Sequence, residues 1–153
     1  MTSDERDMDS QSQPITAADL RLAMAEKEAA KVDEAIKKRA EADRKLEQLF
    51  KEFMKAQVTE KELDAIRQKV LSATERGEME AEIMRFPSKH CRDNGRAINN
   101  GEPDWPATLQ GKARSLYDLF EERGRPRGFK LKAQILDFPG GLLGDVGLTL
   151  SWK

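Results

Sequence analysis

Between Pro14 and Gly77 the chain contains neither glycine nor proline, the two residues that most often interrupt helices. Through much of this stretch, apolar side chains recur at alternating spacings of three and four residues, which is the heptad pattern of a helix that pairs along one face. We therefore predict one long helix over residues 15–57. The positions of its seam are Leu22, Ala25, Ala29, Val32, Ile36, Arg39, Asp43, Leu46, Phe50 and Phe53.

The seam changes character along its length. Its first half is mostly alanine and valine, two charged residues interrupt its middle, and residues 46–54 carry leucine, phenylalanine and methionine. We expect residues 46–54 to pack on the rest of the chain, and the earlier part to project or to pair with another chain. The expected contact residues of this earlier part are Leu22, Val32 and Ile36. The alternative is a free helix held by its own acid-first charge pairs, each worth a few tenths of a kcal/mol: Glu34/Lys38, Glu41/Lys45 and Glu47/Lys51.

A second helix is predicted over residues 58–76. Thr59 followed three residues later by Glu62 is a capping box, and Gly77 is a typical residue just past a helix end. Because this capping box follows the long helix so closely, we favour two antiparallel helices. The alternative is one continuous or kinked helix. Residues 1–14 carry four acids and one base without periodicity, so we expect a disordered acidic tail.

After Gly77 the period of the apolar residues changes from three or four to two, which predicts a strand. A helix should follow a long polar loop, with Asp104 as its cap and Trp105 in its first turn. Two further strands, residues 129–138 and 146–152, form a predicted hairpin. Residues 77–153 are therefore a βαββ domain, and the fold class is α+β: a long N-terminal helix, a short second helix and a small domain with a three-stranded sheet.

The loop of residues 86–106 is much longer than a usual connection, and such loops are typically functional. Its apolar residues and prolines indicate that it is ordered. The candidate binding side chains are its polar ones: Lys89, His90, Arg92, Asp93, Asn94, Arg96, Asn99 and Asn100. Asp-Asn-Gly and Asn-Asn-Gly within the loop are also strong turn sequences, so part of this polarity has a structural interpretation.

Several classes of chemistry find little support in the sequence. The one cysteine and the one histidine, Cys91 and His90, are adjacent, so an extended backbone points them apart, and no catalytic residue is assigned. No Cys or His cluster has zinc-binding spacing, so neither a metal nor a cofactor is expected. The glycine-rich residues 139–145 lack the Lys-Ser/Thr of a phosphate-binding loop. A net charge of −1 makes a nucleic-acid partner improbable, and no apolar run is long enough for a membrane span.

Four large apolar residues form another candidate interface at one end of the sheet. They occupy positions that a strict alternation assigns to the otherwise polar face. If the first two strands run parallel, their ends bring these side chains together, either as an interaction surface or as the docking site of the long helix. The four residues are Met84, Phe86, Leu136 and Phe138.

Four short phrases resemble those of a family of small uncharacterised proteins from alphaproteobacteria. They are Arg85-Phe86-Pro87-Ser88, Gly95-Arg96-Ala97-Ile98-Asn99-Asn100, Pro103-Asp104-Trp105-Pro106 and Asp137-Phe138-Pro139-Gly140-Gly141. The resemblance extends over residues 58–152, and it implies no activity, cofactor or site residue.

From the sequence we expect a cytoplasmic protein-interaction or regulatory module that self-associates through the long helix and carries a polar recognition loop at residues 86–106. One alternative is a domain that binds or converts a small ligand in this loop. Another is contact with nucleic acid through the basic corner of residues 123–132, where Glu121 and Glu122 offer a balancing charge. An enzyme is less favoured than a binding protein, and the identity of any small molecule stays open.

Overall fold

The computed structural model describes residues 13–153. The acidic tail predicted for residues 1–14 therefore lies, apart from Gln13 and Pro14, outside the described residues. The chain divides into two compact units, one extending to Leu46 and the other comprising Glu47–Lys153.

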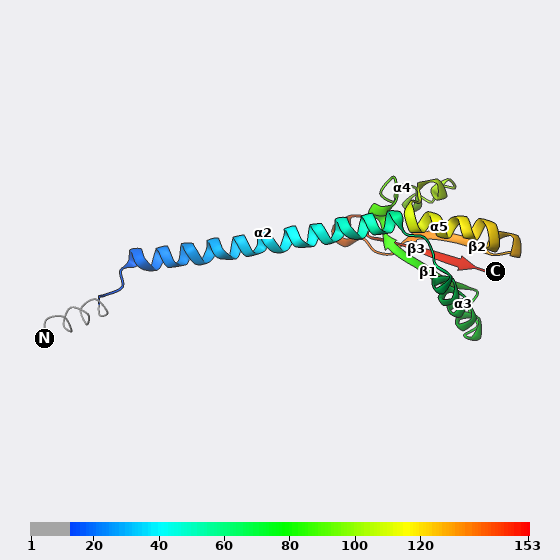
Figure 1. Ribbon diagram of the computed structural model, residues 1–153, viewed down its shortest axis with the longest axis horizontal. Helices are drawn as coiled ribbons and strands as arrows, with labels where there is room; N and C mark the ends of the chain where they lie inside the picture. Colours follow the sequence, from blue (N-terminus) through cyan, green and yellow to red (C-terminus); the bar gives the residue numbers. More distant parts are fainter. Residues whose placement is uncertain (1–12) are drawn as a thin grey trace. The chain divides into compact units, whose positions relative to one another are not determined.

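The first unit contains most of the helix α2 (Ala17–Lys55), which is coloured blue to cyan in Figure 1. Thr16 and Asp19 begin it with a reciprocal pair of bonds. The Asp19 N–H donates to Thr16 Oγ1 (3.1 Å), and the Thr16 N–H donates to Asp19 Oδ2 (3.2 Å). The helix has 39 residues, none of them buried. The predicted long helix is thus confirmed.

The second unit is a small α+β domain that begins with the last turns of α2. Its helices are α3 (Glu60–Glu75), α4 (Arg96–Asn99) and α5 (Gly111–Leu119), with the short helical turns η1 (Ser88–His90), η2 (Trp105–Thr108), η3 (Phe120–Gly124), η4 (Arg125–Arg127) and η5 (Pro139–Gly141). Its strands are β1 (Glu80–Pro87), β2 (Lys130–Ile135) and β3 (Asp145–Ser151). The predicted α+β class and three-stranded sheet are confirmed.

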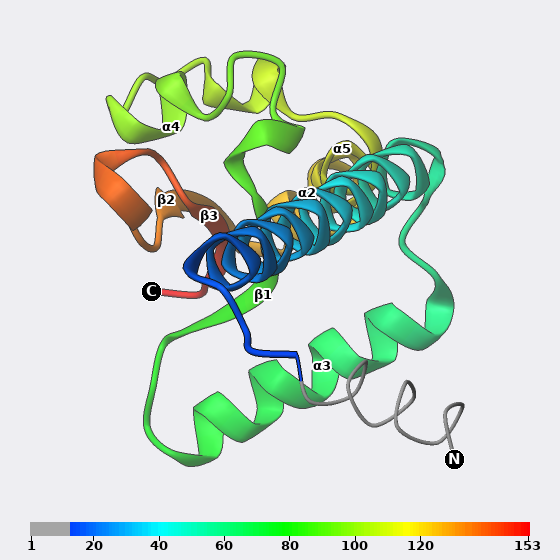
Figure 2. The same ribbon diagram turned by 90° about the vertical axis from the view of Figure 1, so that its left-hand side faces the viewer.

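The three strands lie in the order β1-β3-β2, and β3 is antiparallel to both neighbours. The hairpin of β2 and β3 is present, with Ile135 opposite Val146 at its closed end. The first two strands run in the same direction, but β3 separates them. α3 packs along β1 and α4 lies beside β2, so these helices occupy opposite edges of the sheet (Figure 2).

A bulge in β1 changes which side chains face the core. Glu82 lies opposite Thr149 and Met84 lies opposite Leu148, so Ile83 is one extra residue on β1. The bulge reverses the alternation beyond it, and Met84 and Phe86 therefore share the apolar face with the fully buried Leu148.

The four apolar residues predicted to meet on the polar face do not do so. Phe86 is in the core, 3% exposed, and Met84 packs against that core. Leu136 remains on the polar face, where it covers Gly147, and Phe138 lies beyond the strand with 55% of its surface exposed. Strict alternation gave the wrong phase because it made no allowance for the bulge.

The core lies on the apolar face of the sheet, and the end of α2 completes it as expected. Phe53 of α2, Val58 of the connection to α3, and Ile66 of α3 pack against the buried cluster. The predicted helical hairpin is not formed, since α3 packs on β1 and not back along the Glu47–Lys55 end of α2. On the opposite face Lys132 and Glu80 pair at 3.2 Å, as a solvated face allows.

The helix predicted to start at Asp104 begins later in the chain. Trp105–Thr108 form a separate 3-10 turn, and the Asp104 side chain makes no capping bond. α5 starts at Gly111, which has φ +56° and lies against the backbone of α2. An ideal Cβ on Gly111 would be 2.4 Å from the Phe53 carbonyl oxygen, so this position requires glycine.

Candidate functional site

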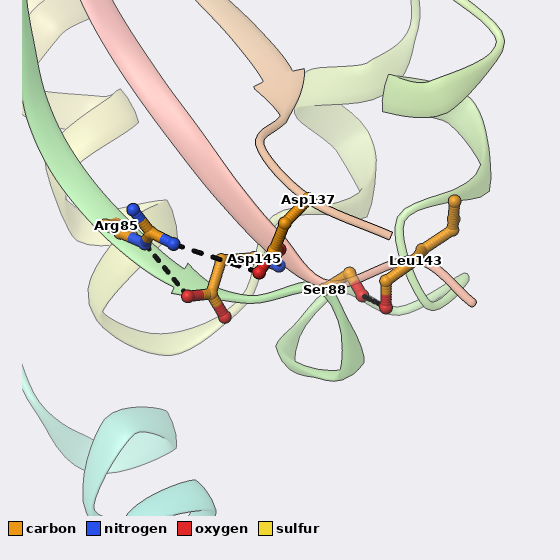
Figure 3. Close-up of polar contacts among 5 residues, drawn as sticks. All are labelled: Arg85, Ser88, Asp137, Leu143 and Asp145. Carbon is orange, nitrogen blue, oxygen red and sulfur yellow. Dashed lines mark hydrogen bonds and ion pairs between the residues drawn. The ribbon is translucent and has the colours of Figure 1, made fainter. Parts of the chain in front are cut away.

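The long loop of residues 88–104 meets the β2–β3 turn at one end of the sheet, and polar contacts hold the two together. Ser88 Oγ donates to the Leu143 carbonyl oxygen (3.0 Å), and the Ser88 N–H donates to the Gly144 carbonyl oxygen (3.0 Å). On the neighbouring strand end, Arg85 Nε donates to Asp145 Oδ2 (2.9 Å) (Figure 3). Asp137 accepts the Asp145 N–H at 2.7 Å. These contacts fix both loops to the sheet.

Within the long loop, Asp93 organises the turn that leads into α4. Its carboxylate accepts the N–H groups of Gly95 (3.0 Å) and Ala97 (2.8 Å). Gly95 has φ +86°, and an ideal Cβ there would lie 2.9 Å from Ser88 Cβ. The turn interpretation of Asp93-Asn94-Gly95 is therefore correct, and Asp93 has a structural role in place of the predicted binding role.

Six of the eight predicted binding side chains of the loop are exposed. Three are cationic, and none of these three forms an ion pair with an acidic side chain within residues 13–153. The six residues are Lys89, Arg92, Asn94, Arg96, Asn99 and Asn100. This part of the prediction gives a polar surface with three cationic side chains, which the exposed Glu102 and Asp104 of the same loop partly balance.

His90 is not part of that surface, which corrects its assignment as a binding residue. It is 8% exposed, and its ring lies 4.5 Å from that of Phe53 and 5.4 Å from that of Phe50, both on α2. Burial lowers the pKa of the imidazole, although the charge of Asp145 opposes this. Among the described residues its Nδ1 has no hydrogen-bond partner. His90 is a neutral docking residue for the end of α2.

The adjacent Cys91 is a core side chain, 2% exposed. Burial, together with the charge of Asp93, raises the pKa of its thiol to about 11. The thiol is therefore protonated at neutral pH, whereas nucleophilic and metal-binding cysteines react as thiolates. Residues 13–153 also contain no cluster of three or more side chains of the metal-binding types.

The basic corner of residues 123–132 is largely balanced by acidic side chains. Arg125 pairs with Glu121, Arg123 lies 3.9 Å from Glu60, and Lys132 pairs with Glu80. Nucleic-acid-binding surfaces carry clustered basic side chains, whereas most basic side chains of this corner are paired with acidic ones. The contacts therefore favour a solvent-exposed corner with balanced charge over a nucleic-acid surface.

Sequence reasoning missed two features of this unit. The first is the ion pair of Arg85 with Asp145, whose partners are 60 residues apart and are brought together by strand pairing alone. The second is an apolar groove between α3 and α5. The sequence held only a partial signal, the additional apolar residue Leu71 beside the expected apolar face of α3, because the groove itself depends on where α5 lies.

No protein-family model, curated protein or solved structure matches the chain. In the described part of the chain, no helix combines the length and the apolar composition needed to cross a membrane.

Proposed function

We propose that the protein is an interaction module that self-associates through the seam of α2. The observation that carries this proposal is the exposure of the seam. Leu22 is 60% exposed, Val32 55% and Ile36 61%, and all three lie on one face of the same helix. Apolar side chains gathered on one face of a long helix favour a partner that removes them from water.

The competing interpretation is a single helix stabilised by its own charged side chains. Within the described part of the first unit, Lys31 and Glu28 form the one ion pair, at 3.5 Å, with both side chains about two-thirds exposed. The acid-first pairs seen in the sequence, such as Glu34 and Lys38, are not within ion-pair distance. Since such pairs contribute only about 0.2–0.5 kcal/mol each, they are a weak alternative to association.

Two charged seam residues indicate how two copies would pair. Arg39 and Asp43 occupy successive seam positions. In a parallel, in-register pair each would face its own copy, which places like charges together. In an antiparallel pair, Arg39 of one copy lies opposite Asp43 of the other, twice by symmetry. Like charges at facing positions destabilise, so the charges favour the antiparallel arrangement.

The sizes of the apolar seam residues support the same arrangement. With Arg39 opposite Asp43, Ile36 lies opposite Leu46 of the second copy and Val32 lies opposite Phe50. The smaller Val32 thus faces the large Phe50, which fills this layer, whereas Leu22 lies opposite position 60, beyond the end of α2. Phe50 keeps 39% of its surface exposed beside His90, so it can contribute an outer face to such a layer.

Disulfide trapping tests both the contact and its direction. An equimolar mixture of Ile36→Cys and Leu46→Cys chains should form a mixed disulfide, while Ile36→Cys alone should not, because its two copies would lie about 15 Å apart along the axis. Glu41→Cys, on the outer side of the helix, is the matched control. The native Cys91 is 2% exposed and does not compete. Cross-linking of Ile36→Cys to itself would refute the antiparallel direction, and absence of any cross-link would oppose association through this seam.

The proposal includes the exposed loop surface defined above as a second contact region, because its cationic side chains are unpaired within residues 13–153. It also includes the cytoplasm as the compartment. A free, buried thiol as the one cysteine of the chain is compatible with a reducing environment.

A further inference from the structure

The second unit contains an apolar groove of about 350 Å³ between α3 and α5. One wall consists of α3 residues, and the other consists of α5 and the residues that follow it, with the apolar face of the sheet beneath. The wall residues that matter here are Leu63, Ile66, Val70 and Leu71 on α3, and Leu119 and Phe129 opposite. Its volume falls at the lower end of the range of small-molecule pockets, about 300–1,000 Å³.

Two polar contacts connect α3 to α5 and to the segment that follows it. Glu62 of α3 forms an ion pair with Lys112, which lowers the pKa of the glutamate carboxyl group, and Glu60 lies 3.9 Å from Arg123. Only Ala73 of α3 is buried, and Leu71 is 57% exposed. On the apolar side of α3, Leu71 is therefore uncovered within its own chain, while Leu63, Ile66 and Val70 are half-buried.

The charged residues that line the groove are all basic, and acidic side chains outside the lining pair with two of them. Three arginines are among its lining residues, Arg67 from α3 and Arg123 and Arg127 from the segment after α5, and no lining residue is acidic. Asp64 pairs with Arg67 and Glu60 approaches Arg123, whereas Arg127 has no ion pair within residues 13–153. Arg127 therefore favours an occupant that has an anionic end beside its apolar body.

We propose that this groove binds a single-chain carboxylate amphiphile of the fatty-acid class. The alkyl chain lies against Val70, Leu71 and Leu119, and the carboxylate accepts hydrogen bonds from the guanidinium group of Arg127. Arginine binds carboxylates with two parallel N–H···O bonds, which gives this end of the site its selectivity. The proposal is independent of self-association through α2, because every lining residue lies in the second unit.

Isothermal titration calorimetry with dodecanoate on the full-length protein tests this site. A ligand of this size in a pre-formed apolar groove should bind with a Kd of about 10–100 µM. Dodecyltrimethylammonium has the same alkyl chain and the opposite charge, and it should bind at least about tenfold more weakly, as expected for the loss of a charged hydrogen bond.

Two exposed substitutions place the ligand. Arg127→Glu and Leu71→Glu should each weaken dodecanoate binding by about tenfold or more. Arg44→Glu and Leu142→Glu are the matched controls, because both are exposed, neither lines the groove, and neither should change the Kd. All four positions are exposed, so the variants should remain folded, and circular dichroism would check that they do.

Three results would overturn the proposal. The first is no dodecanoate binding at ~1 mM, well above the expected Kd. The second is equal affinity for the cationic amphiphile, which would show an apolar site without carboxylate recognition. The third is a change of oligomeric state in Leu71→Glu with unchanged dodecanoate binding, which would make the groove a contact between copies of this chain.

Discussion

Replacing Gly111 with alanine tests how closely the end of α2 lies against α5. Two costs arise at this position. Gly111 has φ +56°, where an alanine costs about 1–2 kcal/mol. Its new Cβ would also lie 2.4 Å from the Phe53 carbonyl oxygen and 2.7 Å from Met54 Cα, both backbone atoms that cannot rotate away.

Gly101→Ala is the matched control, because it carries the first cost without the second. Gly101 has φ +65°, and nothing lies within 4 Å of its ideal Cβ. Displacing packed backbone adds about 1–3 kcal/mol, so Gly111→Ala should lower the free energy of unfolding by that much more than Gly101→Ala does.

Thermal melts followed by near-ultraviolet circular dichroism measure this difference. For a unit of about this size, each kcal/mol corresponds to about 4 °C, so the Tm of Gly111→Ala should lie about 4–12 °C below that of Gly101→Ala. Equal melting temperatures for the two variants would show that α2 does not approach Gly111 as described, and the docking through Phe53 and His90 would lose its support.

Three further predictions concern the second unit. Burial lowers the pKa of His90 in the folded protein below the unfolded value of about 6.5. The free energy of unfolding, measured by urea titration, should therefore be highest above pH ~6.5 and should fall as the pH drops below that value. The variant His90→Phe should not show this pH dependence. Trp105→Ala removes a half-buried ring 6.2 Å from that of Tyr117, and thermal melts should show a loss of about 2 kcal/mol in the free energy of unfolding. Asp104→Ala should lower it by less than about 0.5 kcal/mol, because Asp104 makes no capping bond. A larger loss in Asp104→Ala than in Trp105→Ala would indicate that Asp104 caps a helix after all. Alanine at any one of the exposed loop residues Arg92, Arg96 and Asn99 should change the free energy of unfolding by less than about 0.5 kcal/mol. Larger losses would mean that the loop surface stabilises the fold.

Local sequence signals predicted the helices well because their causes are local. The pairs Thr16/Asp19 and Thr59/Glu62 form reciprocal capping bonds between residues three apart, so no distant part of the chain is needed to specify them. The turn at Asp93-Asn94-Gly95 was equally predictable, since an aspartate side chain reaches the next few N–H groups.

Errors occurred where distant segments decide the structure. The bulge at Ile83 depends on the register with β3, about 65 residues later, and it moved Met84 and Phe86 to the apolar face. Asp104 resembles a helix cap, but α5 starts only at Gly111, where the backbone of α2 lies against it. His90 had the polar neighbours of an exposed residue and became buried because Phe50 and Phe53 pack on it.

The candidate surfaces divide in the same way. The exposed seam of α2 could be predicted from residue spacing alone, because no other described part of the chain covers Leu22, Val32 and Ile36. The groove could not, since it depends on the distance between α3 and α5, which the ion pair of Glu62 with Lys112 helps to fix across 50 residues of sequence.

The molar mass of the full-length protein tests the proposed self-association most directly. Sedimentation equilibrium at ~100 µM should give about 35 kDa for the natural sequence, twice the 17.3 kDa of one chain, because weak coiled-coil pairs form in this concentration range. Ile36→Asp, which places a charge in the seam of an exposed helix without disturbing the second unit, should give 17.3 kDa. A mass of 17.3 kDa for the natural sequence, or an unchanged dimer in Ile36→Asp, would contradict association through α2.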